Sequence, residues 1–200
     1  MARKFTLQFP PTSFVGGDTN TPSYVQHAST SGRIALAFDG AQTEGSMTVP
    51  WVMPDTYDAA ANMTLKLYFY TTTGDAPDGD GINWQVGFEK VTPNPDDSVA
   101  GDNLDLNGAQ GLASGVTHTH EMAGAGTTAG EASVASITIS NANTDAGAGA
   151  GGAAAGDLMR FVVQRLGAGD DYASDIFLTC VELYQEEVRW RFYLTGLVII

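Results

Sequence analysis

Apolar and polar side chains alternate along several short segments of the chain, as in β-strands that have one face in a core and the other in solvent. The clearest segment is residues 62–71, where every second side chain from Met63 to Phe69 is apolar. Tyr68 and Tyr70 belong to the opposite set, which faces outward. We therefore expect a strand with an apolar inner face and with aromatic rings on its outer face.

Two pairs of such segments are predicted to form hairpins, because a stretch rich in Gly and Asp separates the members of each pair. Residues 81–91 alternate in the same way as residues 62–71 and are predicted to be their partner. Residues 156–165 and 176–184 form the second pair. The segment 176–184 is apolar on both sides, which indicates a central strand or a strand at an interface.

Further strands are expected at residues 33–38, 47–53, 117–122 and 131–140, and no segment has a convincing 3.6-residue helical period. The total is about eight strands, with turn-forming residues throughout. We therefore predict an all-β fold, an antiparallel jelly-roll β-sandwich with extended N- and C-terminal arms.

The composition changes nowhere abruptly, so the 200 residues are interpreted as one domain with two arms. Residues 1–22 are predicted to be an N-terminal arm, since their second half is rich in Pro, Gly and Thr and has no periodicity. Residues 23–187 are assigned to the jelly-roll sandwich. Residues 188–200 are predicted to be either an apolar C-terminal arm or the last strand of the sandwich.

The chain is strongly acidic, with a formal net charge of -14 and only nine Lys and Arg residues. Nucleic acid is excluded as a partner, because phosphate binding requires clustered basic residues. The apolar residues 188–200 are far fewer than the roughly 18 needed to span a bilayer, so no membrane association is expected. The N-terminus has no apolar segment of the kind found in a signal peptide, which favours synthesis in a cytoplasm.

Only one motif suggests a metal site. His118 and His120 are two residues apart in an expected strand, so both imidazoles could reach one ion near a threefold axis. An exposed polar strand is the favoured interpretation. The acidic loop with Asp75, Asp78 and Asp80 is interpreted as a solvated turn. No catalytic constellation is present in the sequence, so we expect neither an enzyme nor a cofactor.

The outward rings of Tyr68 and Tyr70 have two interpretations. Aromatic side chains on the outer face of a sandwich can bind carbohydrate. They can equally pack against a neighbouring copy of the chain, and this subunit contact is the favoured interpretation.

The order of motifs along residues 5–185 resembles the jelly-roll structural proteins of tailed bacteriophages. The motifs that carry this resemblance are RIALAFD at 33–39, LKLYF at 65–69, WQVGFE at 84–89, AGDLMRF at 155–161 and VEL at 181–183. The resemblance implies a non-enzymatic virion component, trimeric, such as a capsid decoration (cement) protein or a minor tail or fibre protein. This chain departs from the pattern in continuing past residue 187 to Ile200.

We therefore expect a homotrimer on the exterior of a phage capsid, bound to the major capsid protein. The alternative is a glycan-binding module of a tail fibre or receptor-binding protein. The apolar end of the chain would be an aggregation hazard if exposed, which predicts that another strand of the sandwich or another subunit covers it. Together with Tyr68 and Tyr70, the predicted partner-binding residues are Trp190, Phe192, Tyr193, Leu197, Val198 and Ile199.

Overall fold

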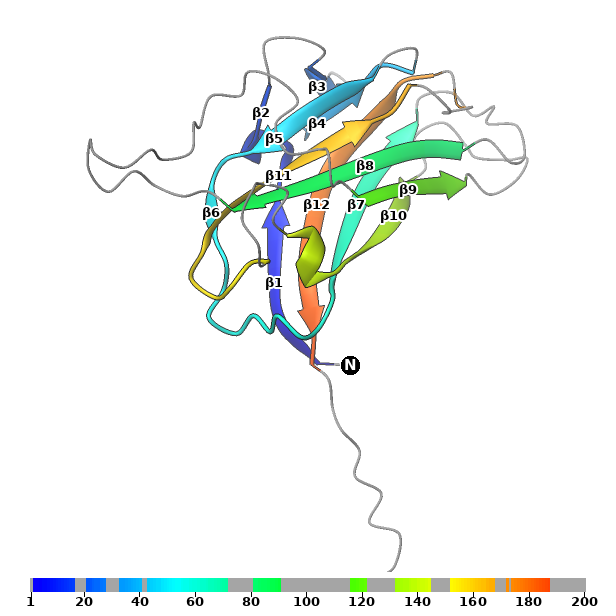
Figure 1. Cartoon of the computed structure of the whole chain (residues 1–200). Coiled ribbons are helices and arrows are strands. Elements are labelled where there is room, and N and C mark those ends of the chain that lie inside the picture. Colours follow the sequence, from blue (N-terminus) through cyan, green and yellow to red (C-terminus); the bar gives the residue numbers. More distant parts are fainter. Residues whose placement is uncertain are drawn as a thin grey trace, which may run out of the picture.

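The computed structural model shows two antiparallel β-sheets packed face to face (Figure 1). It describes residues 2–16, 21–27, 33–40, 43–71, 81–90, 116–121, 132–144, 152–167, 172 and 174–187. The predicted fold class, an all-β antiparallel jelly-roll sandwich, is confirmed. Within the described residues no helix is long and apolar enough to cross a membrane.

The first sheet is built around β12, which has neighbours on both sides. Its strands in spatial order are β10 (Ala132–Ile139), β7 (Met63–Thr71), β12 (Ile176–Glu186), β4 (Arg33–Phe38) and β3 (Ser23–His27). A further strand, β1 (Arg3–Phe9), pairs with the second half of β12.

The second sheet is built around β11. Its strands in spatial order are β2 (Phe14–Gly16), β5 (Glu44–Thr48), β11 (Leu158–Arg165), β8 (Gly81–Lys90) and β9 (Val116–Glu121). The short β6 (Trp51–Val52) pairs with the beginning of β11. Two 3-10 turns, η1 (Pro11–Ser13) and η3 (Asn141–Asn143), lie between strands.

The core fills the space between the two sheets, where aromatic rings from both sheets meet. Phe38 of β4 and Phe69 of β7 contact Trp84 of β8, with ring centroids 5.5 and 5.7 Å apart. Within the second sheet, Phe88 contacts Phe161 of β11 at 5.1 Å. All five side chains are at most 1% exposed. The predicted inward faces of residues 62–71 and 81–91 are therefore confirmed.

Both predicted hairpins are wrong. Strand β7 pairs with β10 and β12, whereas β8 pairs with β11 and β9, so the two segments lie in opposite sheets. Strands β11 and β12 are likewise in opposite sheets. Alternation identifies the face of a strand that meets the core, but it does not identify the neighbour along the hydrogen-bonded edge. The segments of each pair meet across the core, as Phe69 and Trp84 do, instead of edge to edge.

Of the two alternatives predicted for residues 176–184, a central strand or a strand at an interface, the structure shows a central strand. The two faces of this strand are covered in different ways. Val181 and Leu183 face the core, and the opposite face is covered by other side chains of the same chain, such as Arg3 over the ring of Tyr184. A β-bulge between Leu178 and Cys180 interrupts the pairing with β7 and lets Thr179 donate a hydrogen bond to the Tyr68 carbonyl (2.9 Å).

The N-terminal residues are a strand instead of the predicted arm. Residues 3–9 pair with β12, and Phe9 is 6% exposed with its ring 5.0 Å from that of Phe161. Phe5 and Leu7 also pack against the core. The alternation of these three apolar residues is the signal for this strand, and it lies ahead of the Pro- and Gly-rich stretch that suggested an arm.

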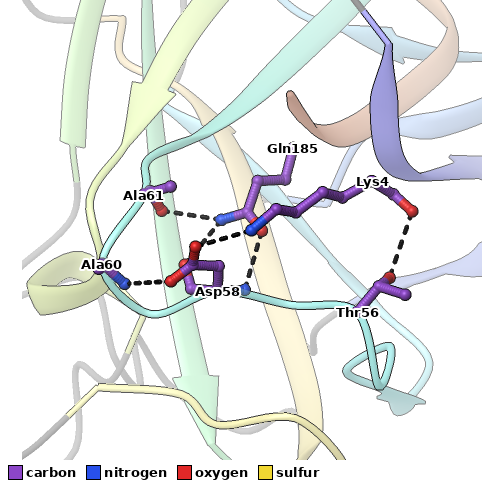
Figure 2. A network of polar contacts seen from close by, with 6 residues as sticks. All are labelled: Lys4, Thr56, Asp58, Ala60, Ala61 and Gln185. Carbon is purple, nitrogen blue, oxygen red and sulfur yellow. Dashed lines mark hydrogen bonds and ion pairs between the residues drawn. The ribbon is translucent and has the colours of Figure 1, made fainter. Parts of the chain in front are cut away.

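A buried amide holds the connection between β6 and β7 against the end of β12 (Figure 2). The Gln185 side chain is 0% exposed, donates hydrogen bonds to the carbonyls of Asp58 and Ala61 (both 2.8 Å) and accepts one from the Asp58 N–H (2.9 Å). The Asp58 carboxylate accepts hydrogen bonds from Lys4 of β1 (2.7 Å) and from the Ala60 N–H (3.0 Å). These two hydrogen bonds, the one from Lys4 first, lower the pKa of Asp58. This network joins β1, β12 and the connecting loop.

Candidate functional site

A network of charged and aromatic side chains covers part of the outer face of the first sheet. The Glu182 carboxylate accepts hydrogen bonds from Arg3 (2.5 Å) and from the Tyr68 hydroxyl (2.9 Å). Burial raises the pKa of Glu182, but these two hydrogen bonds together with the charges of Arg3 and Lys66 outweigh it, so the net pKa is lowered. The Arg3 guanidinium also lies 3.9 Å from the ring centroid of Tyr184. The network fastens β1 to β12 and occupies the Tyr68 hydroxyl.

Tyr70 lies on the same outer face but is almost fully covered. Its ring stacks on Phe177 with a centroid separation of 5.0 Å and an interplanar angle of 14°, and it is only 6% exposed. A sugar stacks on the open face of an aromatic ring, and Tyr70 does not offer one. Tyr68 is partly buried, so this face is a poor platform for a sugar. The predicted role of both tyrosines in contacting a partner remains a prediction.

The remaining predicted sites are only partly described. The strand expected near residues 117–122 is confirmed as β9, in which His118 pairs with Trp84 and His120 with Ile82. Among the described residues no group of three metal-ligating side chains comes together. The six apolar residues predicted to bind a partner, Trp190, Phe192, Tyr193, Leu197, Val198 and Ile199, lie outside the described residues.

A groove opens at the edge of the sandwich where β3 and β4 end the first sheet. Its volume is about 650 Å³, and it is lined by Thr12, Tyr24, Val25, Gln26 and Ile34. Tyr24 is 51% exposed and Ile34 is 43% exposed. These two side chains expose aromatic and aliphatic surface at this edge.

The topology explains why the groove is open. Tyr24 pairs with Leu36 and Gln26 pairs with Ile34, so all four side chains belong to the face of the first sheet that elsewhere meets the core. Leu36 is buried at 1% exposure, whereas its neighbours toward the edge are not. The second sheet ends here in the three-residue strand β2, which is too short to cover β3.

Tyr24 also bridges the two sheets. Its hydroxyl donates a hydrogen bond to the carbonyl of Phe14 in β2. This contact holds the outer end of the side chain in place while about half of its surface stays open to solvent. The ring is therefore a preorganised apolar platform.

The other lining residues add hydrogen-bonding groups without charge. Gln26 offers two N–H donors and one carbonyl acceptor, and Thr12 offers a hydroxyl that can donate and accept. None of the five described lining side chains is charged, although the chain as a whole carries a net charge of -14. The groove is suited to an uncharged ligand that has one apolar face and several hydroxyl groups.

Sequence reasoning missed this site, because residues 23–27 lie between a Pro-rich stretch and the first strand that the pattern identified. A signal for the strand exists, since Tyr24 and Gln26 occupy one face and Pro22 marks the strand start. No sequence signal indicates that this face is uncovered.

The fold and this groove define the chain as an all-β sandwich with an open site at one edge. No protein-family model matches the chain, and no curated protein matches it. Solved structures do match. The arabinose-bound MgGH51 α-L-arabinofuranosidase aligns with a TM-score of 0.47 at 12% identity, over 86% of this chain and 23% of the enzyme.

Two smaller domains align over most of their own length. The CBM36-1 domain of a multidomain xylanase from the hindgut metagenome of Trinervitermes trinervoides has a TM-score of 0.42 at 10% identity, covering 90% of this chain and 96% of the domain. The xylan-binding module CBM15 has a TM-score of 0.42 at 12% identity, covering 92% of this chain and 98% of the module. The chain spans about a quarter of the length of the first two enzymes that it matches. At these identities and TM-scores the likeness says nothing about what this chain binds.

Proposed function

We propose that the chain is a non-catalytic carbohydrate-binding module that holds part of a neutral glycan in the groove beside β3. One observation carries the proposal: the half-exposed ring of Tyr24, held by its hydroxyl, lies in a groove whose described lining side chains, including the amide of Gln26 and the hydroxyl of Thr12, carry no charge.

The chemistry of a sugar ring matches this arrangement. One face of a pyranose exposes C–H groups, which pack against the flat, apolar surface of an aromatic ring. The hydroxyl groups around its rim need both donors and acceptors, which a side-chain amide supplies together. Because Tyr24 is already held in place, binding costs little side-chain entropy.

The size of the groove also fits. A volume of about 650 Å³ lies within the range usual for small-ligand sites and would accommodate about one or two sugar rings. The groove is open at the edge of the sandwich, so the rest of a longer glycan could continue into solvent. We therefore expect recognition of a short stretch of a polysaccharide or of the end of an oligosaccharide.

The test starts from an array of neutral and acidic oligosaccharides probed with the full chain. Isothermal titration with the best neutral ligand then compares three variants. Tyr24→Ala should weaken binding at least tenfold, because it removes the ring. Tyr24→Phe keeps the ring and loses only the hydroxyl that holds it, so it should weaken binding by no more than a few-fold. Tyr68→Ala should bind as the unmodified chain does, because its ring lies on the other face of the sheet.

Two results would contradict the proposal. The first is the absence of any neutral ligand on the array. The second is unchanged affinity in a folded Tyr24→Ala variant. Loss of binding on Tyr68→Ala alone would instead move the site to the outer face of the first sheet.

The resemblance to tailed-phage structural proteins leads us to expect such a module on a virion. A glycan-binding sandwich on the exterior of a virion would attach the particle to cell-surface sugars. The more specific expectations of a capsid decoration role, a trimer and a major capsid protein partner rest on that resemblance alone. Quantitative mass spectrometry of purified particles tests them by counting copies of the chain per capsid.

A further inference from the structure

Strand β10 forms one end of the first sheet and has an edge that no described strand pairs with. Strand β9 of the second sheet lies near β10 but does not pair with it (Figure 1). Its other edge pairs with β7 through all eight residues, and no bulge interrupts the register. The backbone N–H and C=O groups along the open edge of a strand are arranged to accept another strand. A regular strand of eight residues offers a long row of them.

The sequence of β10 does not protect this edge. Natural edge strands usually carry lysine, proline or a bulge, which discourage pairing with another chain. Residues 132–139, ASVASITI, contain no charged residue and no proline, although the chain has 23 acidic residues. The outward side chains of β10 are exposed, with Val134 at 42%.

The other described edges differ from this one. Strands β2 and β3 have only three and five residues. Strand β1 contains Arg3 and Lys4, and strand β9 contains Glu121. Among the described sheet edges, β10 is thus the one that is both long and free of charge.

We propose that β10 pairs in antiparallel register with β10 of a second copy of this chain, around a twofold axis at Ser136. The two first sheets then form one continuous sheet. In this register Val134 lies opposite Thr138 of the partner subunit, and the partner's Val134 lies opposite Thr138. The two Ser136 residues face each other, where their hydroxyls can share a hydrogen bond.

The sequence of β10 is suited to pairing with β10 of a second copy. A twofold contact places the same surface on both subunits, so any charge near the axis would meet itself. Strand β10 has none. The side chains at 134, 136 and 138 share one face of the strand, and cross-strand pairs of β-branched residues stabilise a sheet.

The proposed dimer leaves the groove free. Strands β10 and β3 are at opposite ends of the first sheet, so pairing through β10 keeps both Tyr24 grooves open at the two far edges. A dimer would therefore present two sites to a polymeric ligand and gain avidity. The dimer itself does not depend on the proposed glycan function.

The net charge of -14 sets the expected salt dependence. Two copies repel each other at long range, while the contact itself is uncharged. Because salt screens this repulsion, association should strengthen severalfold between low and physiological ionic strength.

Sedimentation equilibrium of the full chain over a wide concentration range tests the proposal. We expect a reversible monomer–dimer equilibrium. Two double variants then test the register. Val134→Lys with Thr138→Lys places like charges directly opposite each other twice, and should weaken dimerisation at least tenfold. Val134→Lys with Thr138→Glu places opposite charges at the same two pairs, and should restore dimerisation to within a few-fold.

Both positions are exposed and lie four residues apart, so the two double variants should fold equally well, which circular dichroism checks. A chain that stays monomeric at millimolar concentration would overturn the proposal, and so would a trimer, since this twofold contact cannot close around a threefold axis. Equal association of the two variants would also overturn it. Glycan binding by the monomeric variant, measured separately, keeps the two proposals distinguishable.

Discussion

Replacement of Gln185 by Ala tests how much the buried network between β12 and the loop at Asp58 and Ala61 stabilises the sandwich. The side chain is 0% exposed and makes three hydrogen bonds to backbone atoms of Asp58 and Ala61. Alanine removes all three partners at once. The backbone groups of Asp58 and Ala61 lose their side-chain partner and must bond to water instead.

The structure sets the expected size of the effect. Each buried hydrogen bond contributes about 1 kcal/mol net, so the three together contribute about 3 kcal/mol. For a domain of this length, a loss of that size lowers the melting temperature by about 6–12 °C. The free energy of unfolding of a domain is typically about 5–15 kcal/mol, so the variant should remain folded at room temperature.

Urea unfolding followed by tryptophan fluorescence measures the change, since the midpoint shifts while the slope stays constant if only stability is affected. Lys4→Met is the matched control in the same network. It removes the ion pair between Lys4 and Asp58, whose side chains are 25% and 40% exposed, and should destabilise the chain much less than Gln185→Ala because solvent screens the pair. A loss below about 1 kcal/mol for Gln185→Ala would contradict this prediction, and so would a greater loss of stability for Lys4→Met than for Gln185→Ala.

Two further predictions concern backbone strain and pH. Gly152→Ala should lower the melting temperature more than Gly156→Ala does. Both glycines have positive φ, but a Cβ at Gly152 would lie 2.2 Å from the Asn141 side chain, while nothing lies within 4 Å of one at Gly156. Equal losses of melting temperature would contradict this prediction. Glu182 and Asp58 have lowered pKa values in the folded chain, so the unfolded chain binds more protons in acid. The stability that these two carboxylates contribute is therefore present above about pH 4.5 and is lost as the pH falls below that value. Glu182→Gln should reduce the change in melting temperature between neutral and acidic pH, and an unchanged difference would count against this account.

Local pattern was enough to identify which side chains form the core. The alternation in residues 62–71 and 81–91 placed Phe69, Trp84 and Phe88 inward, and all three are at most 1% exposed. It also showed that 176–184 is covered on both faces, which left a central strand and an interface strand as alternatives. These results follow from geometry within one strand, because successive side chains point to opposite faces whatever the neighbouring strand is.

Strand pairing and the open groove depended on distant parts of the chain. Strands β7 and β8 are consecutive, yet they lie in opposite sheets, since a turn-rich stretch between two strands permits either a hairpin or a crossing between sheets. Tyr70 faces outward as predicted but is covered by Phe177. Tyr24 belongs to a core-facing surface and stays exposed because β2 is short. Whether a side chain on a given face is covered depends on what packs against that face, and only the tertiary structure supplies this.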